Sequence, residues 1–241
     1  DTFGVVKWDK STRFFHGKMV QSSYQLLNTL GLTETQAAEL LKPSIDYISL
    51  LRKDVDFMRY HFTDAFAREK DDEEPVRPDG LADRADVIFT LMHKCPHFDE
   101  TELYANFRND VVKSLKERLK RGHILVNGTN ATLFGNGPEL LKYIAGEEII
   151  SELHSGQIYC KRFADKTKLL CARSPHITMG NLYSAENSTH GEIWKYFDLG
   201  ENIVCVNAIG ENIQQRLNGC DYDSDTMLLT DDKLLVEITE K

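Results

Sequence analysis

Apolar residues in the first half of the chain recur at helical spacing. Residues 17–30 predict a helix that ends at Gly31, a residue typical of a C-terminal cap. Thr33 and Gln36 have the spacing of a capping box, which predicts the start of a second helix that runs to Leu41. The chain therefore opens with two short predicted helices.

A longer helical pattern follows from Pro43 and Ser44. Its apolar residues fall on one face, which indicates packing against a core; they are Ile45, Ile48, Leu51, Val55 and Met58. Helical spacing returns over 81–94 and 99–121. The segment between, residues 67–80, reads AREKDDEEPVRPDG, and its charges, prolines and glycine predict an exposed loop or linker.

The period of the pattern changes at Gly122. Short β-rich runs follow, bounded by Gly, Asn and Asp: ILVNG, ATLFG, GQIYCKRF, KLLCARS, NIVCVNAIG, MLLT and KLLVEIT. Some alternate and others are continuously apolar, as in a closed barrel with buried strands. A helical segment over 138–153 interrupts them, with Pro138 near its first turn. We predict an α+β protein: a mostly helical domain over 1–121, then a β-barrel-like domain over 122–241.

Composition narrows the class of protein. Hydrophobic residues make up 41% of the 241 positions, no apolar run reaches the length of a membrane span, and no signal-peptide pattern opens the chain. The chain begins at Asp1 rather than Met, so we expect a fragment or a processed chain. Five scattered cysteines without a C-x-x-C pair predict free thiols in the cytoplasm.

Charge argues against a uniformly basic surface that binds nucleic acid without specificity, because the formal net charge is −9. The distribution is uneven, however. Residues 113–121 and 161–173 each carry five cations and one anion. The first stretch has the pattern of a solvated helix face, whereas the second lies among the motifs described next.

The most informative motif is GCDYDSDTMLL, residues 219–229, which places Asp221, Asp223 and Asp225 at alternate positions. Three carboxylates this close are costly to ionise together unless a cation lies among them. Oxygen ligands favour Mg²⁺ or Mn²⁺ over Zn²⁺, and such ions with open positions commonly work on phosphates. The alternatives are an acidic turn or a solvated strand edge. An EF-hand is excluded, because the loop lacks Gly at its sixth position and Glu at its twelfth.

Four segments in order resemble the catalytic double-psi β-barrel of two-barrel RNA polymerases. They are HILVNGTNATLFGNGPELL (123–141), Gly156-Gln157-Ile158-Tyr159, Arg173-Ser174-Pro175 with Gly180-Asn181, and the aspartate motif. The pattern is most similar to the single-chain RNA-dependent RNA polymerases of RNA silencing and their bacterial and phage relatives. Three positions depart from it: Ser224 replaces a Gly of the family, Asn181 an Asp of the silencing polymerases, and Gly219 an Asn of the multisubunit enzymes.

The resemblance implies a nucleotidyltransferase in which an RNA 3′-hydroxyl attacks the α-phosphate of a nucleoside triphosphate. It implies that Asp221, Asp223 and Asp225 hold two divalent ions, Mg²⁺ or Mn²⁺, and that Arg173 reaches toward the nucleotide or the primer end. The alternative for Arg173 is a structural residue that forms a salt bridge within the barrel. Lys161 and Arg162 are further candidates for phosphate contacts. Candidates to line the template–primer path, each also common as a structural residue, are Asn207, Gln214, Gln215 and Arg216. For His176, we favour a packed or hydrogen-bonded residue over a general acid.

The partners that the resemblance implies are nucleoside triphosphates, an RNA or single-stranded DNA template, and an RNA product. A second barrel from the same parent chain would supply lysines around the triphosphate, so the isolated chain is expected to bind metal weakly and not to polymerise alone. Two alternatives stay open. One is a scaffold barrel with a structural cation. The other is a metal-dependent phosphohydrolase or nuclease, which normally has a His or Glu base beside its carboxylates.

Overall fold

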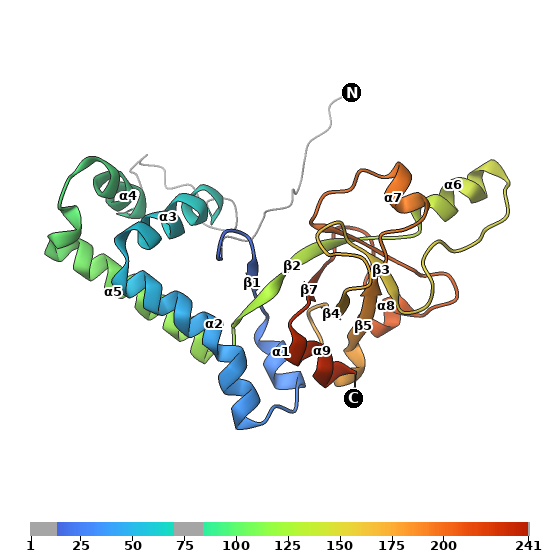
Figure 1. Ribbon diagram of the computed structural model, residues 1–241, viewed down its shortest axis with the longest axis horizontal. Coiled ribbons are helices and arrows are strands. Elements are labelled where there is room, and N and C mark those ends of the chain that lie inside the picture. Colours follow the sequence, from blue (N-terminus) through green and yellow to red (C-terminus); the bar gives the residue numbers. More distant parts are fainter. Residues whose placement is uncertain (1–13, 70–83, 241) are drawn as a thin grey trace.

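A helical arm and a closed β-barrel make up the computed structural model, which describes residues 14–69 and 84–240 (Figure 1). The arm comes from the first half of the chain and the barrel from the second. The predicted α+β class, with helices in the N-terminal half and a β-barrel in the C-terminal half, is therefore confirmed.

The described part of the arm is mainly helical. Its helices are α2 (Glu34–Lys53), α3 (Val55–Glu69), α4 (Arg84–Lys94) and α5 (Glu102–Lys120), with a 3-10 turn η1 (Phe98–Glu100) before α5. Helices α2 and α5 lie side by side along its length (Figure 1). Its core is aromatic, and the Tyr47 hydroxyl lies 2.8 Å from His61 Nδ1. No helix in the described ranges is long and apolar enough to cross a membrane.

Six strands of the described chain close the barrel. They are β2 (Leu125–Phe134), β3 (Gln157–Tyr159), β4 (Lys168–Ala172), β5 (Leu182–Asn187), β6 (Ile203–Val206) and β7 (Thr226–Thr230). The order around the barrel is β2-β6-β3-β5-β4-β7, and β7 pairs back with β2. The β2–β6 and β3–β5 pairs are parallel and the others antiparallel.

Both faces of several strands are buried, which explains their continuous apolar runs. On β4, Leu169 and Cys171 face the barrel interior, whereas Leu170 and Ala172 join an outer cluster. That outer cluster also contains residues of α1 (Tyr24–Thr29) and α9 (Lys233–Thr239), which lie together beside the barrel (Figure 1). The remaining short elements connect the strands: α6 (Gly137–Ala145), η2 (Met179–Asn181), α7 (Glu192–Tyr196) and α8 (Ile213–Arg216).

Gly128 permits the close approach of β2 to β7. Its φ is 152°, and a Cβ atom added there would lie 2.1 Å from the Leu229 carbonyl oxygen. Any side chain at this position would therefore force the two strands apart at the seam that closes the barrel.

Several predicted elements differ from the observed ones. Residues 17–30 do not form one helix, because Met19–Gln21 pair with β2 as strand β1 and α1 begins only after Ser23. The helix cap is Leu30, whose N–H donates to the Leu26 carbonyl, and not Gly31. The predicted run KLLVEIT is helix α9, because Asp232 caps its N-terminus with a 3.1 Å bond from Leu235 N–H.

The Thr33–Gln36 capping box is confirmed, but the helix that it opens continues through Pro43 to Lys53. Ser44 holds this helix to the barrel, since its hydroxyl accepts a 2.8 Å bond from Leu125 N–H. The predicted apolar stripe is only partly buried, because Ile45 is 53% exposed whereas Ile48, Leu51 and Met58 are buried.

The remaining differences concern boundaries. The helix predicted over 138–153 ends at Ala145, because Gly146 adopts a left-handed conformation. The two runs ILVNG and ATLFG belong to one strand, β2, and the strand β5 was not predicted. Of the predicted loop 67–80, the first three residues end α3 and the others lie outside the described residues.

Candidate metal centre

The three aspartates lie in an irregular loop between α8 and β7. Strand β7 follows at Thr226, and the Asp225 carbonyl accepts a 2.8 Å bond from Leu133 N–H on β2. The loop is therefore fixed to the end of the barrel where β2 finishes and β7 begins. Sequence alternation left open whether a strand or a loop carries the carboxylates, and the structure shows a loop.

The loop brings the carboxylates together. One oxygen from each of Asp221, Asp223 and Asp225 lies within 4.8 Å of the others, and no other such cluster of His, Cys, Asp or Glu occurs in the described part of the chain. Two backbone bonds fold the loop: Asp221 N–H donates to Asp225 Oδ2 at 3.0 Å, and Asp223 N–H donates to Asp221 Oδ1 at 3.3 Å. Asp221 and Asp223 are exposed, which leaves their oxygens accessible from solvent.

Like charges crowd in this loop. A hydrogen bond to the Asp221 side chain, together with the charge of that carboxylate, raises the pKa of Asp223. The same contact, and the Asp223 N–H, lower the pKa of Asp221. Of Asp221 and Asp223, Asp223 therefore takes up a proton first as the pH falls, as expected for two close carboxylates. A divalent cation would remove the repulsion, and three oxygen donors suit Mg²⁺ or Mn²⁺.

Arg173 anchors the aspartate loop. Its Nη2 lies 2.6 Å from Asp225 Oδ2, and its Nη1 donates to the carbonyls of Leu217 and Asn218 at 3.2 and 3.0 Å. The guanidinium fork therefore joins the end of β4 to the turn after α8 and to the third aspartate. The structure pairs Arg173 with Asp225, an ion pair of the kind expected for a structural Arg in the barrel, and the predicted contact of Arg173 with a nucleotide or primer end stays a prediction.

Ser224 occupies an unusual backbone conformation within the loop. Its φ is 98°, in the region that favours glycine, and its hydroxyl bonds the Asp223 carbonyl. This is the position at which the resembling polymerases carry Gly. The observed φ is one that Gly adopts without strain, and in this chain Ser adopts it.

Comparisons with known proteins find similarity among solved structures. No protein-family model and no curated protein matches the sequence. Among solved structures, the chain is similar to "RNA dependent RNA polymerase QDE-1 from Thielavia terrestris", with a TM-score of 0.55 and 13% sequence identity. The chain shares its fold with part of an RNA-dependent RNA polymerase. The match covers 89% of this chain and 24% of that polymerase, and at this identity the likeness is one of fold.

Lys161 and Arg162 do not join the aspartates. Lys161 Nζ lies 2.9 Å from Asp198 Oδ1, in an ion pair on the surface. Arg162 Nη2 donates to the carbonyls of Gly17 and Lys18 at 2.6 and 3.3 Å. Because these partners hold both side chains away from the aspartate loop, their predicted phosphate contacts gain no support from the geometry.

Asn207 and His176 both lie in buried, hydrogen-bonded positions. Asn207 is buried, and its Oδ1 accepts bonds from Asn136 Nδ2, Ser151 Oγ and Ile209 N–H at 2.9–3.1 Å, so it fixes the connection after β6. His176 is buried as well, with Nδ1 3.2 Å from the Arg173 carbonyl. Burial lowers the pKa of His176, which agrees with a packed imidazole.

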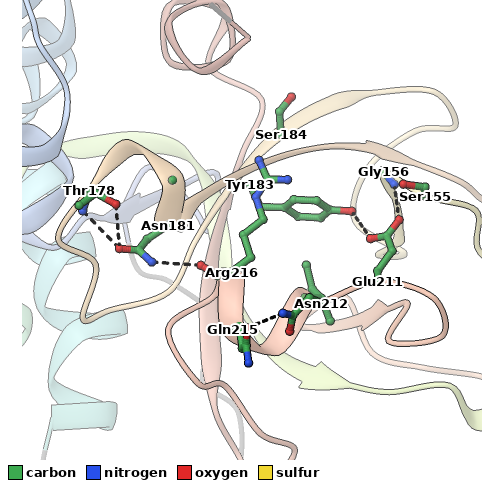
Figure 2. A pocket seen from close by; sticks show the side chains of 12 residues that line it. Ser155, Gly156, Thr178, Asn181, Tyr183, Ser184, Glu211, Asn212, Gln215 and Arg216 are labelled. Carbon is green, nitrogen blue, oxygen red and sulfur yellow. Dashed lines mark hydrogen bonds between the residues drawn. The ribbon is translucent and has the colours of Figure 1, made fainter.

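Sequence reasoning missed the residues that surround the turn after α8. Tyr183 lies on β5, a strand that was not predicted, and Glu211 precedes α8. In this region the sequence had indicated only the motif residues Gly156, Gly180 and Asn181 and the candidates Gln214, Gln215 and Arg216. The Asn181 side chain donates to the Arg216 carbonyl at 3.2 Å, which connects the Pro175 segment to this turn (Figure 2).

Proposed function

We propose that this chain is the metal-binding part of a template-directed RNA polymerase of the double-psi β-barrel kind, most similar to RNA-dependent RNA polymerases. One observation carries the proposal: three carboxylates converge at the end of a closed barrel whose fold matches part of such a polymerase. The chain spans 24% of that polymerase, so the complete enzyme includes further parts, among them the proposed second barrel. The thiols, all free, accord with the proposed cytoplasmic location.

The donor set fits the proposed Mg²⁺ or Mn²⁺ ions. All three ligands are carboxylates, two are exposed, and the raised pKa of Asp223 reflects repulsion that a cation would relieve. When bound, two divalent ions supply charge neutralisation at the phosphates and lower the pKa of the attacking hydroxyl.

The chain's own residues position this site. Arg173 fixes Asp225 through the 2.6 Å ion pair, and the two backbone bonds within the loop hold Asp221 and Asp223 around it. Asp223 lies between the other two in the loop, next to Asp221, and both carboxylates must be ionised to act as ligands.

The proposal is tested by Asp223→Ala in the complete polymerase, assayed by extension on RNA and single-stranded DNA templates with nucleoside triphosphates and Mg²⁺ or Mn²⁺. Loss of one metal ligand removes several kcal/mol of charge stabilisation, so incorporation should fall on the order of a thousandfold or more. Asp198→Ala is the matched control, because it removes an exposed carboxylate outside the loop and should leave the rate unchanged.

Thermal unfolding of the isolated chain separates the alternatives. Millimolar Mg²⁺ should raise the melting temperature of the wild type and not that of Asp223→Ala. Metal stabilisation without nucleotide incorporation by the complete protein would favour the structural cation, and release of nucleotides from RNA would favour a nuclease. Near wild-type extension by Asp223→Ala would show that the metal assignment is wrong.

A further inference from the structure

Helix α6 turns its polar side toward the protein and its apolar side toward solvent. Glu139 is buried, and its Oε1 accepts bonds from Glu152 N–H and Asn136 Nδ2 at 2.7 and 3.2 Å. Lys142 also faces inward, with Nζ 3.1 Å from Glu152 Oε1 and 2.9 Å from Glu192 Oε2. These contacts fix which side of the helix points outward.

The outward side carries large apolar side chains. On α6 and the segment after it they are between 45% and 72% exposed: Leu140, Leu141, Tyr143, Ile144, Ile149 and Ile150. Helix α7, which lies beside α6, adds Trp194 and Tyr196, which are 53% and 66% exposed. We call these eight side chains the α6 surface. Figure 1 shows α6 projecting from the barrel on the side away from the arm.

The α6 surface is larger than the apolar patches that most monomers expose. Single exposed apolar side chains are common, whereas the largest apolar patch on a typical monomer covers about 300–600 Å². At roughly 100 Å² for each large side chain, the α6 surface reaches about 800 Å², the area that each partner buries in a specific interface. The α6 surface therefore has the size of a docking site.

The charges at its edge indicate what covers it. Glu147 and Glu148 follow the last turn of α6, both are exposed, and no cation in the described ranges lies within ion-pair distance of either. The C-terminal end of the helix adds a partial negative charge. A lipid surface is disfavoured, because helices that lie on membranes carry Lys and Arg beside their apolar face. A partner with an apolar face and a basic end is complementary.

We propose that the α6 surface is covered by an amphipathic helix, with Lys or Arg at one end, from the part of the parent polypeptide outside these 241 residues. The proposal rests on the proposed function, in which this chain is one part of a longer polymerase; the match covers 24% of the similar polymerase. A tethered segment is present at high effective concentration, so it covers such a surface more readily than a separate molecule does.

The spacing on α6 favours a helix as the covering element. Leu140, Leu141 and Ile144 stand at positions i, i+1 and i+4 on one side of a nine-residue helix. Such side chains form the rows and grooves into which the side chains of a second helix pack. The basic end of that helix would lie at the C-terminal end of α6, beside Glu147 and Glu148.

The test compares solvent access to the α6 surface in the 241-residue chain and in the complete protein. Ile144→Cys is labelled with a maleimide and followed by mass spectrometry of its own peptide, so that other thiols do not interfere. Ile144 is 72% exposed in this chain. Labelling should be about tenfold slower or more in the complete protein, because the covering helix must open before the reagent enters.

Ile45→Cys is the matched control. Ile45 is 53% exposed on α2 of the arm and is separate from the α6 surface. A lone exposed apolar side chain needs no partner, so the labelling rate at this position should be the same in both proteins.

Two variants test the chemistry of the covering helix in the complete protein. Tyr143→Asp adds a charge to the covered surface and should restore fast labelling of Ile144→Cys. The double change Glu147→Lys and Glu148→Lys sets like charges against the basic end, so labelling should become about threefold faster. Both variants alter exposed side chains and should leave the circular dichroism of the 241-residue chain unchanged.

Equal labelling of Ile144→Cys in the two proteins, or equal slowing of Ile45→Cys, would overturn the proposal. Unchanged labelling after the double charge reversal would show that the partner lacks a basic end. Slowing that grows with protein concentration would identify a second copy instead, and slowing only with phosphatidylserine vesicles would identify a membrane surface. Labelling uses neither nucleotide nor metal. A covered α6 surface would therefore stand even if the complete protein did not polymerise, and an uncovered one would leave the proposed metal site unaffected.

Discussion

Replacing Arg173 by Met tests whether its guanidinium anchors the aspartate loop. The change keeps an apolar stem of similar length and removes three contacts, one with Asp225 and two with the carbonyls of Leu217 and Asn218. The Arg173 side chain is 14% exposed and that of Asp225 is 23% exposed, so water can only partly replace the lost ion pair and hydrogen bonds.

The magnitude follows from these contacts. Hydrogen bonds to charged groups contribute about 1.5–3 kcal/mol each, and removing one partner of a buried ion pair costs about 3–5 kcal/mol. Asn218 is exposed and can bond to water, which lowers the total. We therefore expect Arg173→Met to reduce the free energy of unfolding by about 3 kcal/mol. For a chain of this size that corresponds to roughly 6–12 °C in melting temperature.

Urea unfolding followed by circular dichroism measures this change, and Arg162→Met is the matched control. Arg162 also donates to two carbonyls, but one of these bonds is exposed and Arg162 has no carboxylate partner in the described chain, so its loss should cost less, about 1.5 kcal/mol. Hydrogen exchange should show faster exchange at residues 217–225 in Arg173→Met and not in Arg162→Met. Equal losses in the two variants, or a loss below about 1 kcal/mol for Arg173→Met, would refute the anchoring role.

Two further predictions concern titration and thiol reactivity. Burial lowers the pKa of His176, so the unfolded chain takes up the proton first and stability should fall as pH drops through about 6.5. His176→Gln should reduce that pH dependence and the exposed-site control His97→Gln should not; equal unfolding profiles from pH 7.5 to 5.5 would contradict this. Burial raises the pKa of Cys160 to about 11 and of Cys205 to about 12, so in the native protein only exposed Cys95 should react with a chromogenic disulfide reagent at pH 8. Five thiols should react in denaturant, and rapid native reaction of more than one would show that the barrel opens.

Local signals in the sequence predicted local features well. The capping box at Thr33 and Gln36 depends on residues three positions apart, and the gathering of Asp221, Asp223 and Asp225 depends on a loop of five residues. The order of β-rich runs also indicated a barrel, because continuous apolar runs require burial on both faces.

Features that depend on distant partners could not be predicted. Met19–Gln21 read as helix because their strand partner, β2, lies about a hundred residues away, and tertiary pairing overrides local propensity. The same limit applies to Arg173, whose contacts with the turn after α8 bridge more than forty residues. The motif indicated that Arg173 belonged to the site, but only the structure shows which atoms it touches.

The seam between β2 and β7 has a consequence for the order in which the chain folds. Gly128 pairs with Thr230, so closing the barrel requires a loop of about 100 residues to be brought together, a slow step for which the entropy is lost before the contacts form. During synthesis the helices of the arm are made before the barrel, and β7 is made after the other five barrel strands. The aspartate loop immediately precedes β7, and its Asp225 carbonyl is held by β2. The carboxylates therefore assemble only when the barrel closes, and a nascent chain presents no cation site until β7 has been made.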